Sequence, residues 1–149
     1  RWFTQGGPSL PDATPAEALS ARSRAFLAAL PATRGFATES GPLLLCHGLG
    51  ARDMARLLPD DEGYALSSNF DLWAVHAAHN TAWMIGGHTH RRLARAFDHL
   101  TVLNAGTLHR KHRPCVLLVD FSVPEARFYD VGAAHELSPA EHFSFDTGA

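Results

Sequence analysis

Apolar positions spaced three and four residues apart predict three helices along this chain. The first is expected from about Pro15 to Leu30, because the sequence TPAE at residues 14–17 combines an N-cap, a proline at the first helical position and a capping-box glutamate. A short helix is expected within residues 51–58, and another from Ser68 to about His79. The apolar stripes of the first and last helices are Leu19, Phe26 and Leu30, and Phe70, Trp73 and Ala77.

Shorter apolar runs predict β-strands, which are more frequent in the second half of the chain. The continuously apolar run LLLC is typical of a strand buried on both faces of a sheet, and Asp98-His99 is expected to form a two-residue hairpin turn. Residues 1–13 are expected to form a loop and residues 133–149 a loosely structured tail. The predicted strands are Phe36–Glu39, Leu43–Cys46, Ala82–Ile85, Leu93–Phe97, Leu100–Asn104, Pro114–Phe121 and Ala126–Val131.

Composition limits the class of protein. With 46% hydrophobic and 19% charged residues, residues 1–149 are expected to form a single soluble globular domain. The net charge of −2 argues against nucleic acid or an anionic membrane as the main partner. No apolar run reaches the roughly 20 residues of a membrane span, and no signal peptide is evident. A cytoplasmic protein is therefore expected, with Cys46 and Cys115 as buried thiols.

Histidine is unusually frequent, with ten residues, and three of these follow apolar runs. His47 comes directly after Cys46, while His88 and His90 follow the run ending at Ile85 and two glycines. Ligands of open α/β sheets bind at the carboxyl ends of strands, and side chains at i and i+2 of an extended segment share a face. Because imidazole is a common ligand of transition metals, the pattern favours a metal site. The alternative is a histidine pair on a surface loop.

Four sequence blocks follow one another between Leu43 and Val131. They are HG at residues 47–48, GHTH at 87–90, NAGT at 104–107 and CVLLVD at 115–120. This series resembles the second half of the calcineurin-like metallophosphoesterases, which carry an HG block, a GHTH block, an NPGS-like turn and a closing strand ending in Asp. The resemblance implies an α/β fold of two mixed β-sheets packed as a sandwich with flanking helices. This is a four-layer αββα arrangement, of which the chain would be the C-terminal portion.

The resemblance also implies an enzyme that hydrolyses phosphate mono- or diesters at a dinuclear metal site, with a hydroxide that bridges the ions as nucleophile. His47 and His88 would bind one ion and His90 the other. The implied cofactors are two divalent or trivalent ions, Mn, Fe, Zn or Ni, with Mn favoured. The implied partner is a small-molecule or nucleotide phosphoester substrate, with no stable nucleic acid and no membrane.

The sequence departs from the family pattern at two positions and lacks its first half. Arg92 stands where the family usually has Pro, and Ala105 replaces the Pro of the NPGS turn. The family's earlier blocks, which contain Asp-x-His, Gly-Asp-x-x-Asp and Gly-Asn-His, are not found in this sequence. Since these blocks supply the remaining ligands and the general acid, no residue here is assigned as general acid. The chain is expected to be the C-terminal part of a longer phosphoesterase.

Other polar residues have a functional and a structural interpretation. Asn104 is a candidate for supporting a metal ligand from the NAGT turn, and Arg91 and Arg92 are candidates for contacting a substrate phosphate or for a solvated loop. The sequence HRKHR at residues 109–113 is either an anion-binding loop or a solvated turn between strands. Two alternatives to an enzyme remain: a catalytically inactive scaffold with the phosphoesterase fold, and a mononuclear zinc-binding domain.

Overall fold

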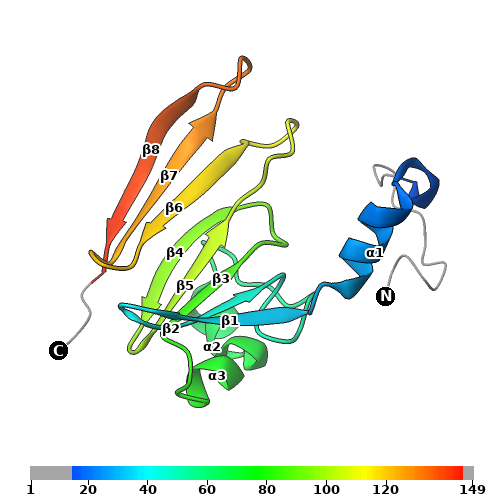
Figure 1. Ribbon diagram of the computed structural model, residues 1–149. Helices are drawn as coiled ribbons and strands as arrows, with labels where there is room; N and C mark the ends of the chain where they lie inside the picture. Colours follow the sequence, from blue (N-terminus) through cyan, green and yellow to red (C-terminus); the bar gives the residue numbers. More distant parts are fainter. Residues whose placement is uncertain (1–14, 146–149) are drawn as a thin grey trace. The chain divides into compact units, whose positions relative to one another are not determined.

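The computed structural model describes residues 15–145 of the chain, which divides into two compact units, Arg1–Pro31 and Ala32–Ala149. In the first unit, the 3-10 helix η1 (Ala16–Ala18) precedes the α-helix α1 (Ala21–Ala29) (Figure 1). Residues 1–13, predicted to be a loop, lie outside the described residues. The organisation of residues 1–149 as one domain stays a prediction.

The helix α1 begins later than its sequence pattern predicts. The hydroxyl oxygen of Ser20 accepts a hydrogen bond from the backbone N–H of Ser23, which caps the helix at that point. Thr14, the predicted cap, lies outside the described residues. No residue of α1 is buried, and Phe26 and Leu30 are exposed, so the apolar stripe of this helix is not part of a core.

The second unit contains a five-stranded mixed sheet with the order β1-β2-β3-β5-β4. The central strands β2, β3 and β5 are parallel, while β1 and β4 are antiparallel to their neighbours. The hairpin between β4 and β5 turns at Asp98, whose φ of 46° is tolerated by Asp, and confirms the predicted turn. The strands are β1 (Thr33–Thr38), β2 (Gly41–Cys46), β3 (Trp83–Gly86), β4 (Arg92–Phe97) and β5 (Leu100–Ala105).

The strand β2 is less buried than its continuous apolar run predicts. Leu44 packs against the apolar cluster that includes Leu72 of the helices. Leu43 packs against the apolar cluster between the two sheets, but Leu45 is 44% exposed. The second sheet therefore covers only part of this face, and the prediction of burial on both faces was wrong for the carboxyl end of the strand.

Two helices, α2 (Gly63–Ser67) and α3 (Phe70–Ala77), lie on one face of the five-stranded sheet (Figure 1). Asn69 caps α3 by accepting a hydrogen bond from the N–H of Leu72, one residue later than the predicted cap at Ser68. This start turns Leu72 into the core, fully buried, and leaves Phe70 81% exposed. The predicted position of Phe70 in the inner stripe was wrong.

Residues 51–58 form turns and an extended loop instead of the predicted helix. Leu49 and Arg52 pair as an isolated β-bridge, and the N–H of Leu58 donates to the carboxylate of Asp61. Leu49 and Leu57 are both buried in the same cluster. Their burial is expected to contribute about 1.5–3 kcal/mol for each side chain, which outweighs the local helix propensity of this segment.

A second, three-stranded sheet has the order β6-β7-β8, with both pairs antiparallel. It consists of β6 (Cys115–Asp120), β7 (Glu125–Val131) and β8 (Leu137–Ser144). The expectation of a loosely structured tail was wrong for residues 137–144, because β8 pairs with β7 along its length. Most side chains of β8 are exposed, so its sequence lacks the apolar alternation that marks a strand.

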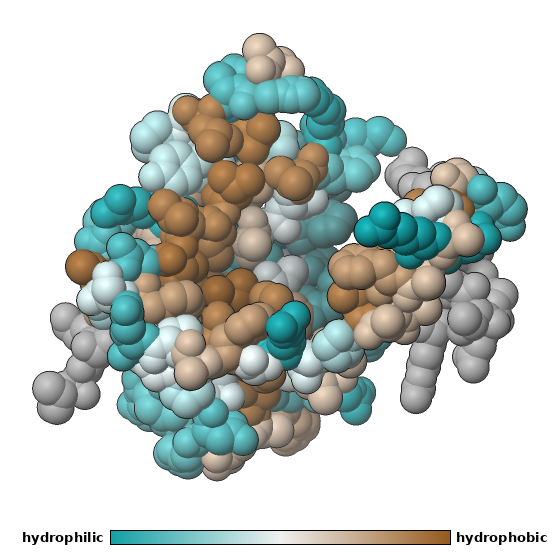
Figure 2. Space-filling model, in the orientation of Figure 1, coloured by the Kyte–Doolittle hydropathy of each residue, from teal (hydrophilic) through white to brown (hydrophobic). Residues whose placement is uncertain are grey.

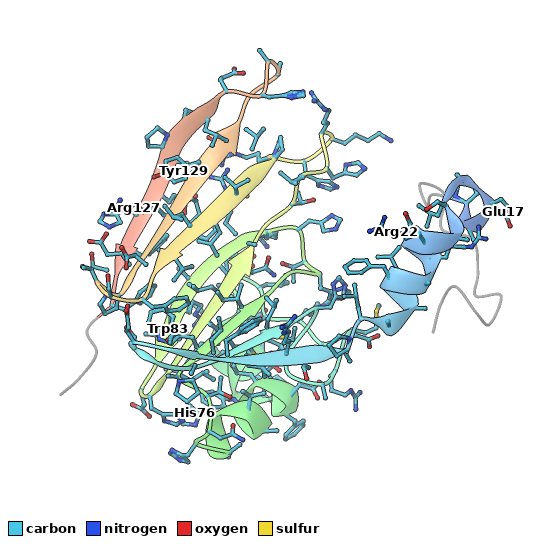
Figure 3. The ribbon with its side chains drawn as sticks, viewed as in Figure 1. Glu17, Arg22, His76, Trp83, Arg127 and Tyr129 are labelled. Carbon is cyan, nitrogen blue, oxygen red and sulfur yellow. The ribbon has the colours of Figure 1, made fainter. Side chains whose placement is uncertain are left out.

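The two sheets pack face to face around Trp83, Leu103 and Ala126, which are buried together. Trp83 lies between the sheets (Figure 3), where its ring meets Phe121 edge to face and its indole N–H donates to the carbonyl of Ser40. Apolar residues gather in a band where the sheets face each other (Figure 2). The predicted α/β sandwich of two sheets is confirmed. Among residues 32–145, helices cover only one of its outer faces.

No helix within residues 15–145 has the length and apolar character needed to cross a membrane.

Candidate functional site

Three segments meet at one edge of the five-stranded sheet, where the parallel strands end. The registers pair Leu45 of β2 with Ile85 of β3, and Gly86 of β3 with Asn104 of β5. His47 follows the first strand, the GHTH segment follows the second, and Asn104 lies near the end of the third. The carboxyl-end position predicted for the histidines is therefore where the structure places them.

His47 and His88 lie next to each other, with ring centroids 5.2 Å apart and the rings inclined by 67°. A hydrogen bond of 2.9 Å from the N–H of Gly87 to the carbonyl of His47 joins their two loops. The first loop turns so tightly that a β-carbon on Gly48 would lie 2.4 Å from the carbonyl oxygen of Arg52, and a β-carbon on Gly86 would lie 2.9 Å from the carbonyl oxygen of Gly48. Glycine is therefore required at this position of the HG block.

His88 and His90 do not share one face of a strand, as their i and i+2 spacing predicted. The strand β3 ends at Gly86, and both histidines are in the left-handed region, with φ of 66° and 58°. His90 lies instead beside the loop between β5 and β6, with ring centroids 5.3 Å from His112 and 6.5 Å from His109. The structure thus separates His90 from the pair formed by His47 and His88. The resemblance implies the same division into ligands of two ions.

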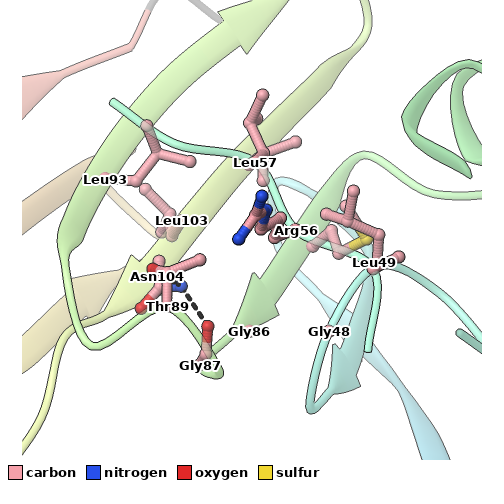
Figure 4. Close-up of a pocket in the computed structure, with 13 residues that line it drawn as sticks. Gly48, Leu49, Arg56, Leu57, Gly86, Gly87, Thr89, Leu93, Leu103 and Asn104 are labelled. Carbon is pink, nitrogen blue, oxygen red and sulfur yellow. Dashed lines mark hydrogen bonds between the residues drawn. The ribbon is translucent and has the colours of Figure 1, made fainter. Parts of the chain in front are cut away.

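Asn104, on the adjacent strand β5, holds the GHTH loop. It is 6% exposed, and its amide nitrogen donates to the carbonyl of Gly87 and, at 3.0 Å, to the hydroxyl of Thr89 (Figure 4). Its amide oxygen accepts a hydrogen bond of 2.9 Å from the N–H of Gly106. The space under this loop is a cavity of about 10 Å³ lined by Gly48, Gly86 and Asn104 among others, which is about the minimum for one water molecule. Asn104 therefore holds the residues on either side of His88, through the backbone of Gly87 and the side chain of Thr89.

Arg91 and Arg92, the candidate phosphate contacts, both have carboxylate partners. Arg91 pairs with Asp60 at 2.8 Å on the surface. The side chain of Arg92 is only 10% exposed and bonds to Asp130 of β7 and, at 3.3 Å, to Glu141 of β8. Burial opposes the charge of Arg92, but the bonds to these carboxylates outweigh it and raise the pKa of Arg92 above its ordinary value. Arg92 thus joins the two sheets.

Cys46 and Cys115 are free thiols, as predicted. Cys115 is buried, and Cys46 is half-buried with its pKa raised by burial, so it is held as a neutral thiol beside His47. His76, on α3 (Figure 3), forms a separate cluster with His79 and His99.

The donor set fits part of a metal site. Two imidazoles bound to one tetrahedral ion have ring centroids roughly 5 Å apart, given metal–nitrogen distances of about 2.0–2.1 Å. The separation of His47 and His88 matches this value. However, no group of three or more His, Cys, Asp or Glu side chains among residues 15–145 is placed to hold a metal ion. The described residues therefore supply part of a ligand set and do not complete a dinuclear centre.

Sequence reasoning missed two features of the site. The approach of His109 and His112 to His90 depends on the path of the loop between β5 and β6, and only the local abundance of histidine in HRKH marks it. Thr89 contributes as well, since its hydroxyl accepts from the N–H of Arg91 and from Asn104. In the sequence, only the position of Thr89 between His88 and His90 indicated that it could contribute to the site.

A scan against models of protein families found no match, and a search of curated proteins found none. Solved structures do match. Wild-type Vps29 complexed with Zn²⁺ from Entamoeba histolytica has a TM-score of 0.51 and 18% identity, over 79% of this chain and 63% of that one. A hypothetical protein of Pyrococcus horikoshii has a TM-score of 0.59 and 16% identity, over 73% of this chain and 43% of that one. A predicted phosphoesterase of Streptococcus pneumoniae has a TM-score of 0.50 and 19% identity, over 79% and 64%.

These structures share the calcineurin-like metallophosphoesterase fold, and the described chain has that fold. The resemblance found from the sequence blocks is thus confirmed at the level of fold. The chain spans less than two thirds of the length of each of the three matched structures.

Proposed function

We propose that this protein is a metal-dependent phosphoesterase in which His47 and His88 bind one metal ion and His90 contributes to a second. The observation that supports this most is the convergence of His47 and His88 at the carboxyl edge of the sheet, beside a loop fixed by Asn104. The Zn²⁺ complex of the Entamoeba Vps29 supports a cation in this fold. We propose Mn as the metal, a small-molecule or nucleotide phosphoester as the substrate, and the cytoplasm as the location.

Bound ions would supply an acidified water molecule and neutralise the charge that develops at phosphorus. The chain's own part in this function is positioning. The imidazoles of His47 and His88 offer nitrogen ligands, while Gly86 lets the two loops approach each other. Asn104 restrains the peptide of Gly87, so that His88 keeps its place without a cost of ordering when an ion binds.

We infer that the remaining ligands and the general acid lie outside residues 1–149. Two considerations support this. The described residues contain no complete donor group, and the chain covers 63% of the Entamoeba Vps29 structure, so part of the fold in that structure has no counterpart here. Carboxylates and an amide from that part of the fold would complete the pair of ions.

Binding of Mn²⁺ to the 149-residue chain, measured by isothermal titration calorimetry, tests the ligand assignment. We expect weak binding that His47→Ala and His88→Ala each abolish, because each removes one of two donors. His76→Ala serves as the matched control, since it removes an imidazole of a separate cluster. Equal affinity in all four chains would overturn the assignment.

Hydrolysis of bis-p-nitrophenyl phosphate in Mn²⁺ tests the activity itself, in a longer protein that includes this chain and the remaining ligands. His88→Ala and His90→Ala are expected to lower kcat by at least about a hundredfold while circular dichroism stays unchanged, given the several kcal/mol that a bound ion contributes. Unchanged turnover in either variant would refute the proposal.

A scaffold without catalysis is the second candidate, and the missing third donor in the described residues favours it. Hydrolysis and metal content distinguish this candidate from the enzyme and from a mononuclear zinc-binding domain. A scaffold predicts hydrolysis at the background rate in the longer protein with Mn²⁺ present. An enzyme predicts two ions for each chain, and a mononuclear zinc-binding domain predicts one, as measured by mass spectrometry of bound metal.

A further inference from the structure

His90 and His112 form a second pair of imidazoles with the spacing of metal ligands. Their ring centroids are 5.3 Å apart, and the rings are inclined by 74°. This separation is close to the 5.2 Å between His47 and His88, and to the roughly 5 Å expected of two imidazoles on one tetrahedral ion. Both rings line the same open cavity at the start of β4. Side chains from two different loops thus reach one space.

The ring nitrogens of this pair are not used by other groups of the described chain. Neither His90 nor His112 forms a hydrogen bond or an ion pair through its ring within residues 15–145. His109 differs, although its ring lies 5.2 Å from that of His112, because its Nδ1 accepts a hydrogen bond of 3.3 Å from the N–H of Lys111. A neutral imidazole that accepts at Nδ1 carries its proton on Nε2, so His109 has no nitrogen left for a metal ion.

The separate cluster of His76, His79 and His99 does not offer a similar pair. Nε2 of His76 lies 3.6 Å from a carboxylate oxygen of Asp98, and Nε2 of His99 lies within hydrogen-bond distance, 3.0 Å, of the carbonyl oxygen of His76. The rings of His79 and His99 are stacked 4.1 Å apart with only 20° between their planes. Nitrogen lone pairs lie in the ring plane, so those of nearly parallel rings do not converge on one ion. His90 and His112 are thus distinguished by inclined rings as well as by unused nitrogens.

The charges around His90 and His112 do not exclude a cation. The cavity that the two rings line also has three arginines in its wall, and three carboxylates pair with them. Lys111, a further cation of the wall, has an interaction partner as well. Paired charges leave little net field to repel a metal ion. The arginine pairs are Arg91 with Asp60, Arg92 with Asp130 and Glu141, and Arg113 with Asp130.

The two loops that carry the pair have a defined shape. The N–H of His112 donates a hydrogen bond of 3.0 Å to the carbonyl of His109, which closes a turn. His90 has a φ of 58° and follows Thr89, whose hydroxyl accepts a hydrogen bond of 3.0 Å from the amide of Asn104. Less order is then lost when an ion binds than if both loops were free.

We propose that His112 is a ligand of the second metal ion and binds it together with His90. The inference rests on the proposed function, which assigns His90 to that ion. His112 lies between the NAGT and CVLLVD blocks, outside the four blocks that carry the family resemblance, so the resemblance does not imply this donor. Since no third donor is placed at the pair within residues 15–145, the other ligands would be water or the groups inferred to lie outside residues 1–149.

Binding of Zn²⁺ to the 149-residue chain with ¹⁵N-labelled histidine tests this, because the ¹⁵N chemical shift of an imidazole nitrogen changes when that nitrogen binds a metal ion. Zn²⁺ binds nitrogen ligands more tightly than Mn²⁺, which this exposed pair is not expected to hold without further ligands. We expect the ring signals of His90 and His112 to shift together. In His112→Ala, the Zn²⁺ concentration that shifts His90 is expected to rise by at least about tenfold, since even the loss of a group that only supports a ligand costs this much.

His109→Ala is the matched control, because it removes an imidazole of the same loop whose nitrogens are not available to an ion. It is expected to change the Zn²⁺ concentration that shifts His90 by less than about twofold, as surface substitutions usually do. The signals of His47 and His88 report the first site, and neither variant is expected to alter their response to Zn²⁺.

The inference is wrong if His90 and His112 do not shift with Zn²⁺, if His112→Ala leaves the response of His90 unchanged, or if His109→Ala weakens that response as much. His112 is exposed, so circular dichroism is expected to show an unchanged fold in His112→Ala. Failure of the proposed function gives a different result. Hydrolysis by the longer protein, or binding at His47 and His88, would then be absent while His90 and His112 still shift together.

Discussion

His88 and His90 are separated by one residue and yet contact different neighbours, because both take the left-handed backbone conformation. Histidine in this region is uncommon and mildly unfavourable, and such a conformation persists only where the surroundings hold it. Here the loop is held by hydrogen bonds from the amide of Asn104 to Gly87 and Thr89, the two neighbours of His88. The sequence pattern identified the three histidines, but a two-residue period could not reveal a loop whose shape depends on an amide from another strand.

Asn104→Ala is expected to lower the free energy of unfolding by about 2–3 kcal/mol, because it removes three hydrogen bonds of a buried group. Urea denaturation, monitored by circular dichroism, measures this change in the free energy of unfolding. Asn80→Ala is the control, since Asn80 is exposed and accepts one hydrogen bond from Thr81. It is expected to cost about 1 kcal/mol, because it removes one hydrogen bond instead of three. Equal stability of the two variants would show that Asn104 does not support the loop.

Strands were easier to predict than helices, and the reason is visible in particular elements. The strands β3 to β7 pack apolar side chains against at least one apolar cluster. Their sequences therefore contain apolar residues at the buried positions, which makes the strands predictable. In contrast, β8 is held by backbone pairing to β7 and shows almost no apolar pattern. The segment 51–58 has a helical pattern, but burial of Leu49 and Leu57 favoured an extended path. Contacts distant in sequence decided both cases.

The contact between β4 and the three-stranded sheet makes stability depend on pH. The hydrogen bond from Arg92 lowers the pKa of the Asp130 carboxyl below its ordinary value, despite some opposing desolvation. A lowered pKa in the folded state means that this stabilisation is fully present above the unfolded pKa of about 3.9 and is lost as pH falls below it. Melting temperatures between pH 2 and 7 are therefore expected to fall less steeply in Asp130→Asn than in the unsubstituted chain.

The neutral variant Asp130→Asn is expected to be less stable at pH 7 and to approach the unsubstituted chain in stability as the pH falls through the lowered pKa of Asp130. Asp53→Asn is the control, because Asp53 is an exposed loop residue, and its curve is expected to run parallel to that of the unsubstituted chain. Parallel curves for Asp130→Asn as well would mean that the bond to Arg92 contributes nothing to the pH dependence.

At the scale of the whole molecule, the described residues form a sandwich of two sheets, with the adjacent pair His47 and His88 at the edge of one sheet. Sequence blocks were sufficient to identify the metallophosphoesterase fold, because their order and spacing reflect strand ends that meet at one edge. They were not sufficient to show which donors converge. That depends on the backbone conformation at His88 and His90.

We expect residues 1–149 alone to show no Mn²⁺-dependent hydrolysis of bis-p-nitrophenyl phosphate above background, measured by release of p-nitrophenolate. Three histidines divided between two places do not hold two ions in the geometry for attack at phosphorus. The His88→Ala chain is the baseline for this assay. Turnover by the unsubstituted chain that His88→Ala removes would mean that the ligand set is complete within 149 residues.

Arg92 joins β4 to β7 and β8 through the carboxylates of Asp130 and Glu141. A guanidinium held in this way could turn toward a substrate phosphate only if the contact between the two sheets were broken. The second residue after the GHTH block is therefore committed to the packing of the sandwich. A family that keeps this arginine is expected to vary first in the exposed loops around it, because loops tolerate substitution without loss of the core.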